Sequence, residues 1–447
     1  MWIEDQFGLP LPSGAAPAVA DWNRCVEGFL AHSAETPARL DAALSAAPDF
    51  ALAQATRGLF FVLLARPECL DVARGALDAA RTGAPDPRSP AYVEALELGL
   101  LGRLGAAADR LDALLLAHPE DALAAKLVHA LRFMVGDAVG MRASIERVLG
   151  AVDRDHAHRP FLLGCHAFAL EETGEYDAAE RIGRTAVEAR PDDAWGLHAV
   201  LHVHEMTARA AEGLRWMEGR EAGWRGCNNF AFHIHWHVAL FRLDLGDREG
   251  ALRLYDERVR TEPTEDFRDI ANAASLLARL EIEGVEVGRR WEELADIAQR
   301  RAADACSAFA DLHYLLALVG AGRRAEAEVL AARIAAEARR CDAGDMPEAA
   351  RAGGGLAASG LAALAGRDDE TAARRLVKAA PRLQRIGGSH AQRDVFHWIA
   401  VSACLRAGRR DLAAEALAER GRRRIGCDGF TRRRLEDCED GPTVARP

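Results

Sequence analysis

The sequence is short of the residues and patterns that mark several common protein classes. Aromatic residues make up 6% of it, and its 9 cysteines show no CxxC or similar paired spacing. No stretch approaches the roughly 18 uncharged apolar residues that a membrane span needs. Lys and Arg number 57 against 68 Asp and Glu, so the basic surplus typical of nucleic-acid-binding proteins is missing. These absences argue against a disulfide framework, a zinc knuckle, a membrane protein and a nucleic-acid-binding protein.

Targeting and nucleotide motifs are missing as well. The first residues carry two acids and no basic segment followed by an apolar stretch, so we do not expect a signal peptide. Cysteines without paired spacing fit a reducing compartment, which predicts a cytoplasmic protein. The sequence has no Walker loop, no GxSxG elbow and no GxGxxG turn. Nucleotide cofactors held by the usual loops are therefore not expected.

What the sequence has in abundance is helix-forming residues arranged in a repeat. Ala, Leu, Arg and Glu dominate, which predicts an all-α protein. The segment "GEYDAAERIGRTAVEARPDD" at 174–193 has the glycine, alanine and proline offsets of a tetratricopeptide repeat, whose period is about 34 residues. In that repeat the glycine ends a first helix, small residues let the second helix pack closely, and proline stops the second helix.

Glycines at the ends of the first helices predict the number of repeats. The predicted ends are Gly102, Gly136, Gly174, Gly246, Gly322, Gly366 and Gly408. The gaps on either side of Gly246 are each long enough for two repeats, which places the missing ends near Ala208 and Gly284. We therefore predict an α-solenoid of about nine irregular tetratricopeptide-type hairpins that form a curved superhelix with a concave binding face.

The same pattern predicts the organisation of the chain. We expect an extended N-terminal lead over 1–20, one continuous solenoid over 21–430, and a partly disordered C-terminal tail over 431–447. The segment 342–355 is predicted to be an internal loop, because glycine and other turn-forming residues cluster there. The Arg-rich segment 419–437 is interleaved with acids, which is typical of a solvated terminal helix.

Histidines are concentrated in two of the predicted first helices, at 193–207 and 228–244. "HAVLHVHEM" at 198–206 and "FHIHWHVAL" at 232–240 hold six of the 15 histidines. On an α-helix, His198, His202 and Glu205 share one face, because residues at i, i+4 and i+7 align. His204 lies about half a turn away and is expected to pack between helices.

The second of these helices repeats the pattern. Asn229, His233 and His237 form the equivalent stripe, with Trp236 beside it, while His235 lies about half a turn away and is expected to pack between helices. Because neighbouring helices pack about 8–10 Å apart, the two stripes could converge on the concave face.

Three chemistries fit such stripes. The first is a divalent metal, zinc or iron, held by His198, His202, Glu205 and His237 with an open coordination position. The second is metal-free acid–base catalysis by His202, Glu205 and His237. The third is recognition alone, in which the imidazoles bind a polar or anionic ligand. These histidines could also be core residues with satisfied hydrogen bonds.

Other polar residues are candidates for binding a substrate. Arg393, in the string Gln392, Arg393 and Asp394, could hold a carboxylate or phosphate through two hydrogen bonds. The alternative is an Arg–Asp pair that ties adjacent repeats together. Asp311 and His313 begin another first helix, where the acid could simply favour the helix dipole and the imidazole could be partly buried.

A further polar segment, over 267–284, admits two interpretations. Asp269, Asn272 and Ser275 lie among apolar residues there. Such residues fit an interface between helices as well as they fit a binding site.

Four strings of this sequence together resemble one known family. "DDAWGLHAVLHVHEM", "HIHWHVALF", "IEGVEVGRRW" and "GGSHAQRDVF" are similar to segments of the tetratricopeptide repeat protein 38 family, and the resemblance covers nearly the whole chain. It implies the helical-repeat fold and a shared polar site, and it names no substrate. His235 and His390 depart from the family pattern. The positions that match it are His198, His202, His204, Glu205, His233, Trp236, His237, Asp311, His313, Gln392, Arg393 and Asp394.

Two functions therefore stay open. The first is a pocket on the concave face that binds a small polar or acidic ligand, as a metal-dependent enzyme or a histidine acid–base enzyme. The second is a non-catalytic scaffold that holds a peptide or a partner protein in its groove. Neither function involves nucleic acid or a membrane.

Overall fold

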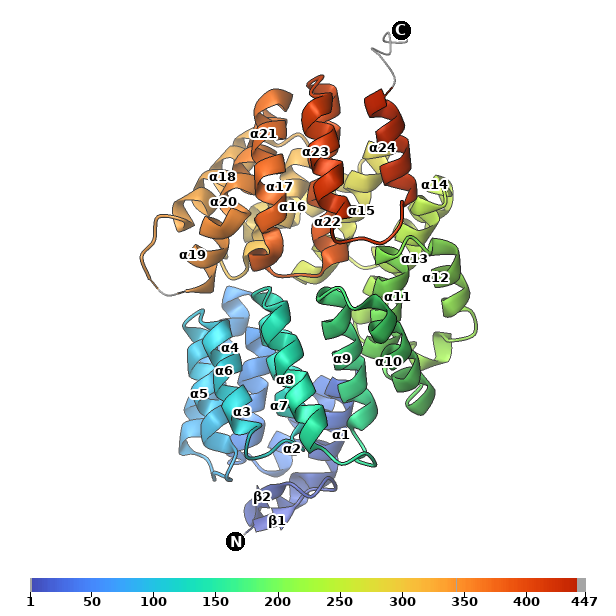
Figure 1. Cartoon of the computed structure of the whole chain (residues 1–447). Helices are drawn as coiled ribbons and strands as arrows, with labels where there is room; N and C mark the ends of the chain where they lie inside the picture. Colours follow the sequence, from blue (N-terminus) through green and yellow to red (C-terminus); the bar gives the residue numbers. More distant parts are fainter. Residues whose placement is uncertain (1, 343, 440–447) are drawn as a thin grey trace. The chain divides into compact units, whose positions relative to one another are not determined.

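Helices are the main secondary structure of the computed structural model, which describes residues 2–342 and 344–439 (Figure 1). The predicted all-α fold class is confirmed. The described residues divide into two compact units. The first holds 2–203, 217–231 and 344–345, and the second holds 204–216, 232–342 and 346–439. Helices α11 and α13 contribute residues to both units. No helix among the described residues is long and apolar enough to cross a membrane.

The first unit starts with a short antiparallel hairpin, in which Ile3 pairs with Leu11, and continues as paired helices. Its elements are β1 (Trp2–Glu4), β2 (Pro10–Pro12), a 3-10 helix (Ser13–Ala18), α1 (Val19–Leu30), α2 (Thr36–Ala46), α3 (Ala51–Val62), α4 (Pro67–Thr82), α5 (Ser89–Leu100), α6 (Leu104–Leu114), α7 (Ala122–Met134), α8 (Ala138–Ala151), α9 (Arg159–Glu172), α10 (Tyr176–Ala189) and most of α11 (Ala194–Met206), with a 3-10 turn at Glu221–Gly223.

The second unit is built in the same way. Its elements are α12 (Ala210–Met217), most of α13 (Phe230–Asp244), α14 (Arg248–Leu254), a π-helical turn (Tyr255–Val259), α15 (Phe267–Ile282), α16 (Arg290–Arg301), α17 (Ala308–Gly320), α18 (Arg324–Glu337), α19 (Asp345–Ala349), a π-helical turn (Ala350–Gly354), α20 (Gly355–Ala365), α21 (Asp369–Ala379), a 3-10 helix (Ala380–Ile386), α22 (His390–Arg406), α23 (Arg410–Gly421) and α24 (Gly429–Glu439).

The predicted helix ends are visible as left-handed backbone. Both ends inferred for the long gaps are present, because Ala208 has φ 55° and Gly284 has φ 79°. Gly366 is an exception: its φ is −80°, and Arg367, with φ 59°, takes the left-handed position instead. The predicted ends with positive φ are Gly102, Gly136, Gly174, Gly246, Gly322 and Gly408.

A glycine–aspartate pair links two helices at several of these ends, as Gly136 and Asp137 illustrate. Gly136 has φ 68°, and the amide of Asp137 donates to the carbonyl of Arg132 at 2.9 Å, which closes α7. The side chain of Asp137 then accepts from the amide of Gly140 at 3.0 Å and caps α8. Two adjacent residues thus set the turn between the helices.

Three segments contain secondary structure that the sequence did not predict. The predicted loop at 342–355 is helical from Asp345 onward, as α19 and a π-helical turn. The predicted lead contains the β1–β2 hairpin and a 3-10 helix. Within the predicted tail, residues 431–439 belong to α24, and residues 440–447 lie outside the described residues.

Candidate functional site

Helix α11 carries the first histidine pair, and Asp193 fixes where this helix begins. One carboxylate oxygen of Asp193 accepts from the amide of Gly196 at 3.1 Å, as an N-cap residue does. The other oxygen fits between Gly164 and Gly196, where a Cβ atom on either glycine would approach it to 2.2 or 2.3 Å. Burial raises the pKa of Asp193 to about 7, although the charge of Lys126 opposes the shift.

His198 and His202 lie one turn apart on α11 and are both buried. Their Nε2 atoms are 2.9 Å apart, and the ring of Phe168 stacks on His198 at 5.6 Å between centroids. Two nitrogens bound to one zinc ion at about 2.0–2.1 Å are separated by roughly 3 Å. The pair therefore has a spacing that suits metal chelation as well as a hydrogen bond.

Two adjacent glutamates at the end of α9 lie next to His202. Glu171 and Glu172 are buried, and one carboxylate oxygen of Glu171 lies 3.5 Å from Nδ1 of His202. One ligand atom from each of these three residues lies within 4.8 Å of the others. The first unit thus gathers two carboxylates and an imidazole in a buried place, which is a donor set that transition metals accept.

In the second unit, His233 and Trp236 on α13 bond to side chains of α15. Nδ1 of His233 lies 3.0 Å from Oδ1 of Asn272, and the Trp236 indole donates to the Ser275 hydroxyl at 3.2 Å. Burial holds the pKa of His233 well below its usual value, and the neighbouring His237 lowers it further. Asn272 and Ser275 therefore belong to a helix interface that also positions a candidate site residue.

His237 faces Glu205, the carboxylate predicted from sequence to share its chemistry. Nδ1 of His237 lies 3.2 Å from a carboxylate oxygen of Glu205, and both side chains are largely buried. Burial alone would raise the pKa of Glu205, but the hydrogen bond with His237 and the charge of Arg424 lower it overall. Glu205 is therefore held as a carboxylate that accepts from the imidazole.

The same nitrogen has an oxygen acceptor in two of the buried histidines. The acceptors are Asn272 for His233 and Glu205 for His237. Because a carboxylate or an amide oxygen can only accept, Nδ1 is the nitrogen that carries the proton in these two rings. The lone pair then stays on Nε2, which is the arrangement that orients metal-binding histidines.

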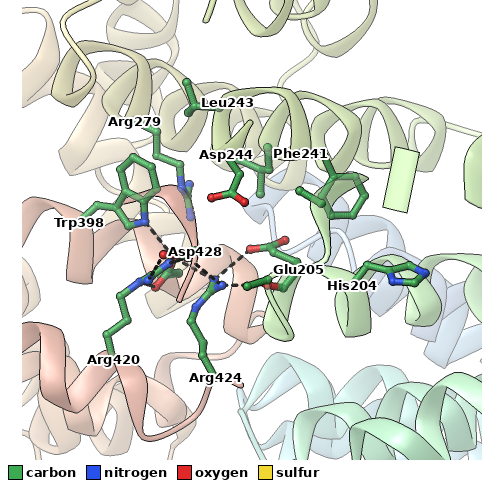
Figure 2. A pocket seen from close by; sticks show the side chains of 14 residues that line it. His204, Glu205, Phe241, Leu243, Asp244, Arg279, Trp398, Arg420, Arg424 and Asp428 are labelled. Carbon is green, nitrogen blue, oxygen red and sulfur yellow. Dashed lines mark hydrogen bonds and ion pairs between the residues drawn. The ribbon is translucent and has the colours of Figure 1, made fainter. Parts of the chain in front are cut away.

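Glu205 also begins a chain of charges that runs through the second unit (Figure 2). Arg424 contacts Glu205 at 3.3 Å and Asp394 at 3.1 Å, and Arg420 contacts Asp394 at 2.7 Å and Asp428 at 2.5 Å. Burial would raise the pKa of Asp394, but Arg420 and Arg424 hold it far below its usual range. The prediction that the Arg-rich segment is a solvated helix is wrong for these two arginines, because both are buried in ion pairs.

These charged residues line a pocket of the second unit together with His204. His204 is fully buried, as predicted, and it is also among the residues that line the pocket (Figure 2). His235, the other histidine expected to pack between helices, is half-buried.

Gln392 and Arg393 have local partners. Gln392 forms a capping box with Ser389 at the start of α22. Arg393 donates to the carbonyls of Gly387 and Gly388 and, at 2.9 Å, to the side chain of Gln384. Its guanidinium braces the turn before α22 and does not line the pocket around Glu205.

Asp311 and His313 lie on α17, where both are buried. Asp311 pairs with Arg333 at 2.6 Å, and burial raises its pKa to about 6. Nδ1 of His313 lies 2.8 Å from the Phe309 carbonyl, and burial lowers the pKa of His313 to about 4. These contacts belong to the packing of α17, and neither residue is among those that line the pocket.

The predicted metal ligands are divided between the two units. His198 and His202 belong to the first unit, Glu205 and His237 belong to the second, and the predicted set as a whole stays a prediction. His198 and His202 in the first unit, and His233 and His237 in the second, are all buried, and their ring nitrogens are potential metal ligands. Asn229, predicted to share a stripe with His233, is half-buried in the first unit.

Sequence reasoning missed Asp244, Asp428 and five further charged residues of these two regions. The signal for Glu171 and Glu172 was present, because they end the otherwise apolar stretch "FLLGCHAFALEE". Arg420 and Arg424 are spaced i, i+4, but the surrounding charges hid them. Arg279 is the fifth, and nothing in its local sequence separates it from a surface arginine.

No protein-family model matches this chain. The resemblance to the tetratricopeptide repeat protein 38 family therefore stays a prediction.

Proposed function

We propose that this protein binds a divalent transition-metal ion, zinc or iron, through its buried histidines and uses it on a small polar or acidic ligand. One observation carries the proposal: His202 lies with Glu171 and Glu172 in a buried cluster of the first unit that could hold a metal ion. In the second unit, Nδ1 of His233 and Nδ1 of His237 each have an oxygen acceptor, which fixes the orientation and the tautomer of both rings. A neutral imidazole with its lone pair on Nε2 is the form that ligates metals.

The carboxylates in the first unit support the same function. Glu171, Glu172 and His202 offer two oxygens and one nitrogen within 4.8 Å of one another. Three protein ligands are the usual complement of a catalytic metal site, which keeps one position open for water or substrate. A metal in such a site would polarise an oxygen of the ligand or activate a bound water. This donor set therefore favours an enzyme over a non-catalytic scaffold.

The test compares His202→Ala with the matched variant His129→Gln. His129 is also buried in the first unit, but its Nε2 accepts the Trp195 indole N–H at 3.1 Å, so it is not a ligand candidate. After loading with Zn²⁺ and gel filtration, we expect bound metal by mass spectrometry in the wild type and in His129→Gln, and its loss in His202→Ala. Circular dichroism checks that each variant is folded. Wild-type protein that retains no metal, or a folded His202→Ala variant that retains the wild-type amount, contradicts the proposal.

A further inference from the structure

Three buried arginines line the pocket of the second unit, and one of them differs from the others. Arg420 and Arg424 each contact two or more carboxylates. Arg279 is equally buried, with 1% of its surface exposed. Within residues 2–342 and 344–439, no Asp or Glu forms an ion pair with Arg279.

The guanidinium of Arg279 is held rigidly by neutral groups. It donates to the carbonyl of Ser275 at 3.1 Å and to the carbonyl of Ala391 at 2.7 Å. It lies 5.6 Å from the ring centre of Trp236 and 5.8 Å from that of Trp398. These contacts use two of its five N–H donors and fix its plane.

A buried cation without a touching anion is costly, because water no longer solvates it. The effect is visible in the pKa of Arg279, which burial lowers to about 10 even though Asp394 and Glu205 raise it from a distance. Arginine ordinarily stays above that range. A bound anion would remove this cost, so the unpaired guanidinium is a candidate ligand group.

The pocket gives an anion access to Arg279. The cavity itself has a volume of about 30 Å³ and opens to solvent, so it has room for a ligand of a few heavy atoms and is too small for a peptide. Figure 2 shows Arg279 among the side chains that surround the cavity. Asp244 lines the same cavity, and burial raises the pKa of its carboxyl group, so it takes up a proton more readily than an exposed aspartate.

We propose that this pocket binds a small monocarboxylate whose two oxygens pair with the guanidinium of Arg279. The proposal rests on the proposed function, because it names the class of the acidic ligand. A guanidinium donates two parallel hydrogen bonds to a carboxylate, which matches the free donors of Arg279. Glu205, Asp394 and Asp428 line the same pocket and repel a ligand with two negative charges. A single carboxylate therefore fits best.

The first experiment needs no variant. Isothermal titration calorimetry measures the binding of propionate, butyrate and pyruvate to the wild-type protein, with propionamide as the uncharged analogue and malonate as the dianion. We expect saturable binding of at least one monocarboxylate, and binding of propionamide and malonate about 10-fold weaker or more, because hydrogen bonds between charged groups are the strong ones. The proposal is overturned if no monocarboxylate binds, or if propionamide binds as tightly.

The second experiment uses Arg279→Lys and Arg279→Gln, with Arg393→Gln as the matched control. Arg393 is also buried and bonded to backbone carbonyls, but it does not line the pocket. We expect affinity to fall about 10- to 100-fold in Arg279→Gln, less in Arg279→Lys, and to stay within about twofold in Arg393→Gln. Unchanged affinity in a folded Arg279 variant overturns the proposal. If Arg279→Gln does not fold, the affinity of Arg279→Lys and the comparison of propionate with propionamide test the proposal instead.

Titrations of chelator-treated protein separate this inference from the proposed metal function. Carboxylate binding that persists without metal supports the Arg279 site by itself. Protein that holds metal but binds no carboxylate contradicts only this inference, and protein that binds carboxylate but never holds metal contradicts only the proposed function.

Discussion

At the scale of single residues, Asp193 links stability to pH. Its folded-state pKa of about 7 lies above the usual aspartate value of 3.8, so between about pH 4 and pH 7 the folded chain binds more protons than the unfolded chain. The free energy of unfolding should therefore fall as pH rises through this window, by up to about 4 kcal/mol from this group. Denaturant unfolding of the wild type and of Asp193→Asn at pH 5 and pH 8 measures this change in the free energy of unfolding.

Asn at position 193 keeps the oxygen that caps α11 and cannot ionise. We expect Asp193→Asn to gain stability over the wild type at pH 8 and to gain little at pH 5. Asp192→Asn, at the half-buried neighbouring position, is the control and should reduce the pH dependence only slightly, because the charge of Asp192 is one of the smaller causes that raise the pKa of Asp193. An equal difference between wild type and Asp193→Asn at both pH values would refute this account of Asp193.

A second residue-scale prediction concerns the orienting carboxylate Glu205. The sequence predicts Glu205 as a metal ligand, whereas its contact with Nδ1 of His237 indicates that it orients that ring; in the second case, removing its charge weakens the basicity of Nε2 of His237. Glu205→Gln should therefore lower metal affinity by about 10- to 100-fold and leave the maximal metal content unchanged. Competition with a chelating dye measures the affinity. A fall in the maximal content would instead make Glu205 itself a ligand.

At the scale of helices, Asp368 tests how the repeat turns are made. Its side chain accepts from the amide of Thr371 at 3.0 Å and caps α21. Asp368→Ala should lower the free energy of unfolding by about 1 kcal/mol, whereas Asp368→Asn, which can still cap, should change it little. Urea denaturation measures both values. An equal loss of unfolding free energy in the two variants would show that capping of α21 is not how Asp368 stabilises the chain.

The helices and their ends were predictable because their signals are local. The glycine ends are set by backbone conformation within one turn, and inferred ends at Ala208 and Gly284 follow from the repeat period. The i, i+4 spacing placed His198 beside His202 for the same reason. These features need no knowledge of what packs against the helix.

The partners of the site residues were not predictable, because distant segments supply them. Arg424 meets Glu205 across 219 residues of sequence, and Arg279 donates to the carbonyl of Ala391 across 112. A helical period shows which residues share a face but not what covers that face. The histidines expected on a groove are buried. Arg393, the expected anchor, has local partners, and Arg279, which the sequence did not single out, is the anchor proposed above.

At the scale of the whole molecule, a bound metal should stabilise the folded chain. A ligand that binds only the folded state adds about 2.7 kcal/mol of stability when its free concentration is about 100 times its dissociation constant. Metal-loaded protein should therefore melt several degrees above chelator-treated protein, and His202→Ala should lose the difference. Differential scanning calorimetry measures the midpoints. Equal midpoints for metal-loaded and chelator-treated wild-type protein would contradict metal binding to the folded chain.

X-ray absorption spectroscopy of the metal-loaded protein tests the central claim most directly. For Zn²⁺ we predict nitrogen and oxygen scatterers at about 2.0–2.1 Å, with the outer-shell pattern of two or more imidazoles. Sulfur at about 2.3 Å, or a spectrum without imidazole scattering, would contradict a site built from the buried histidines.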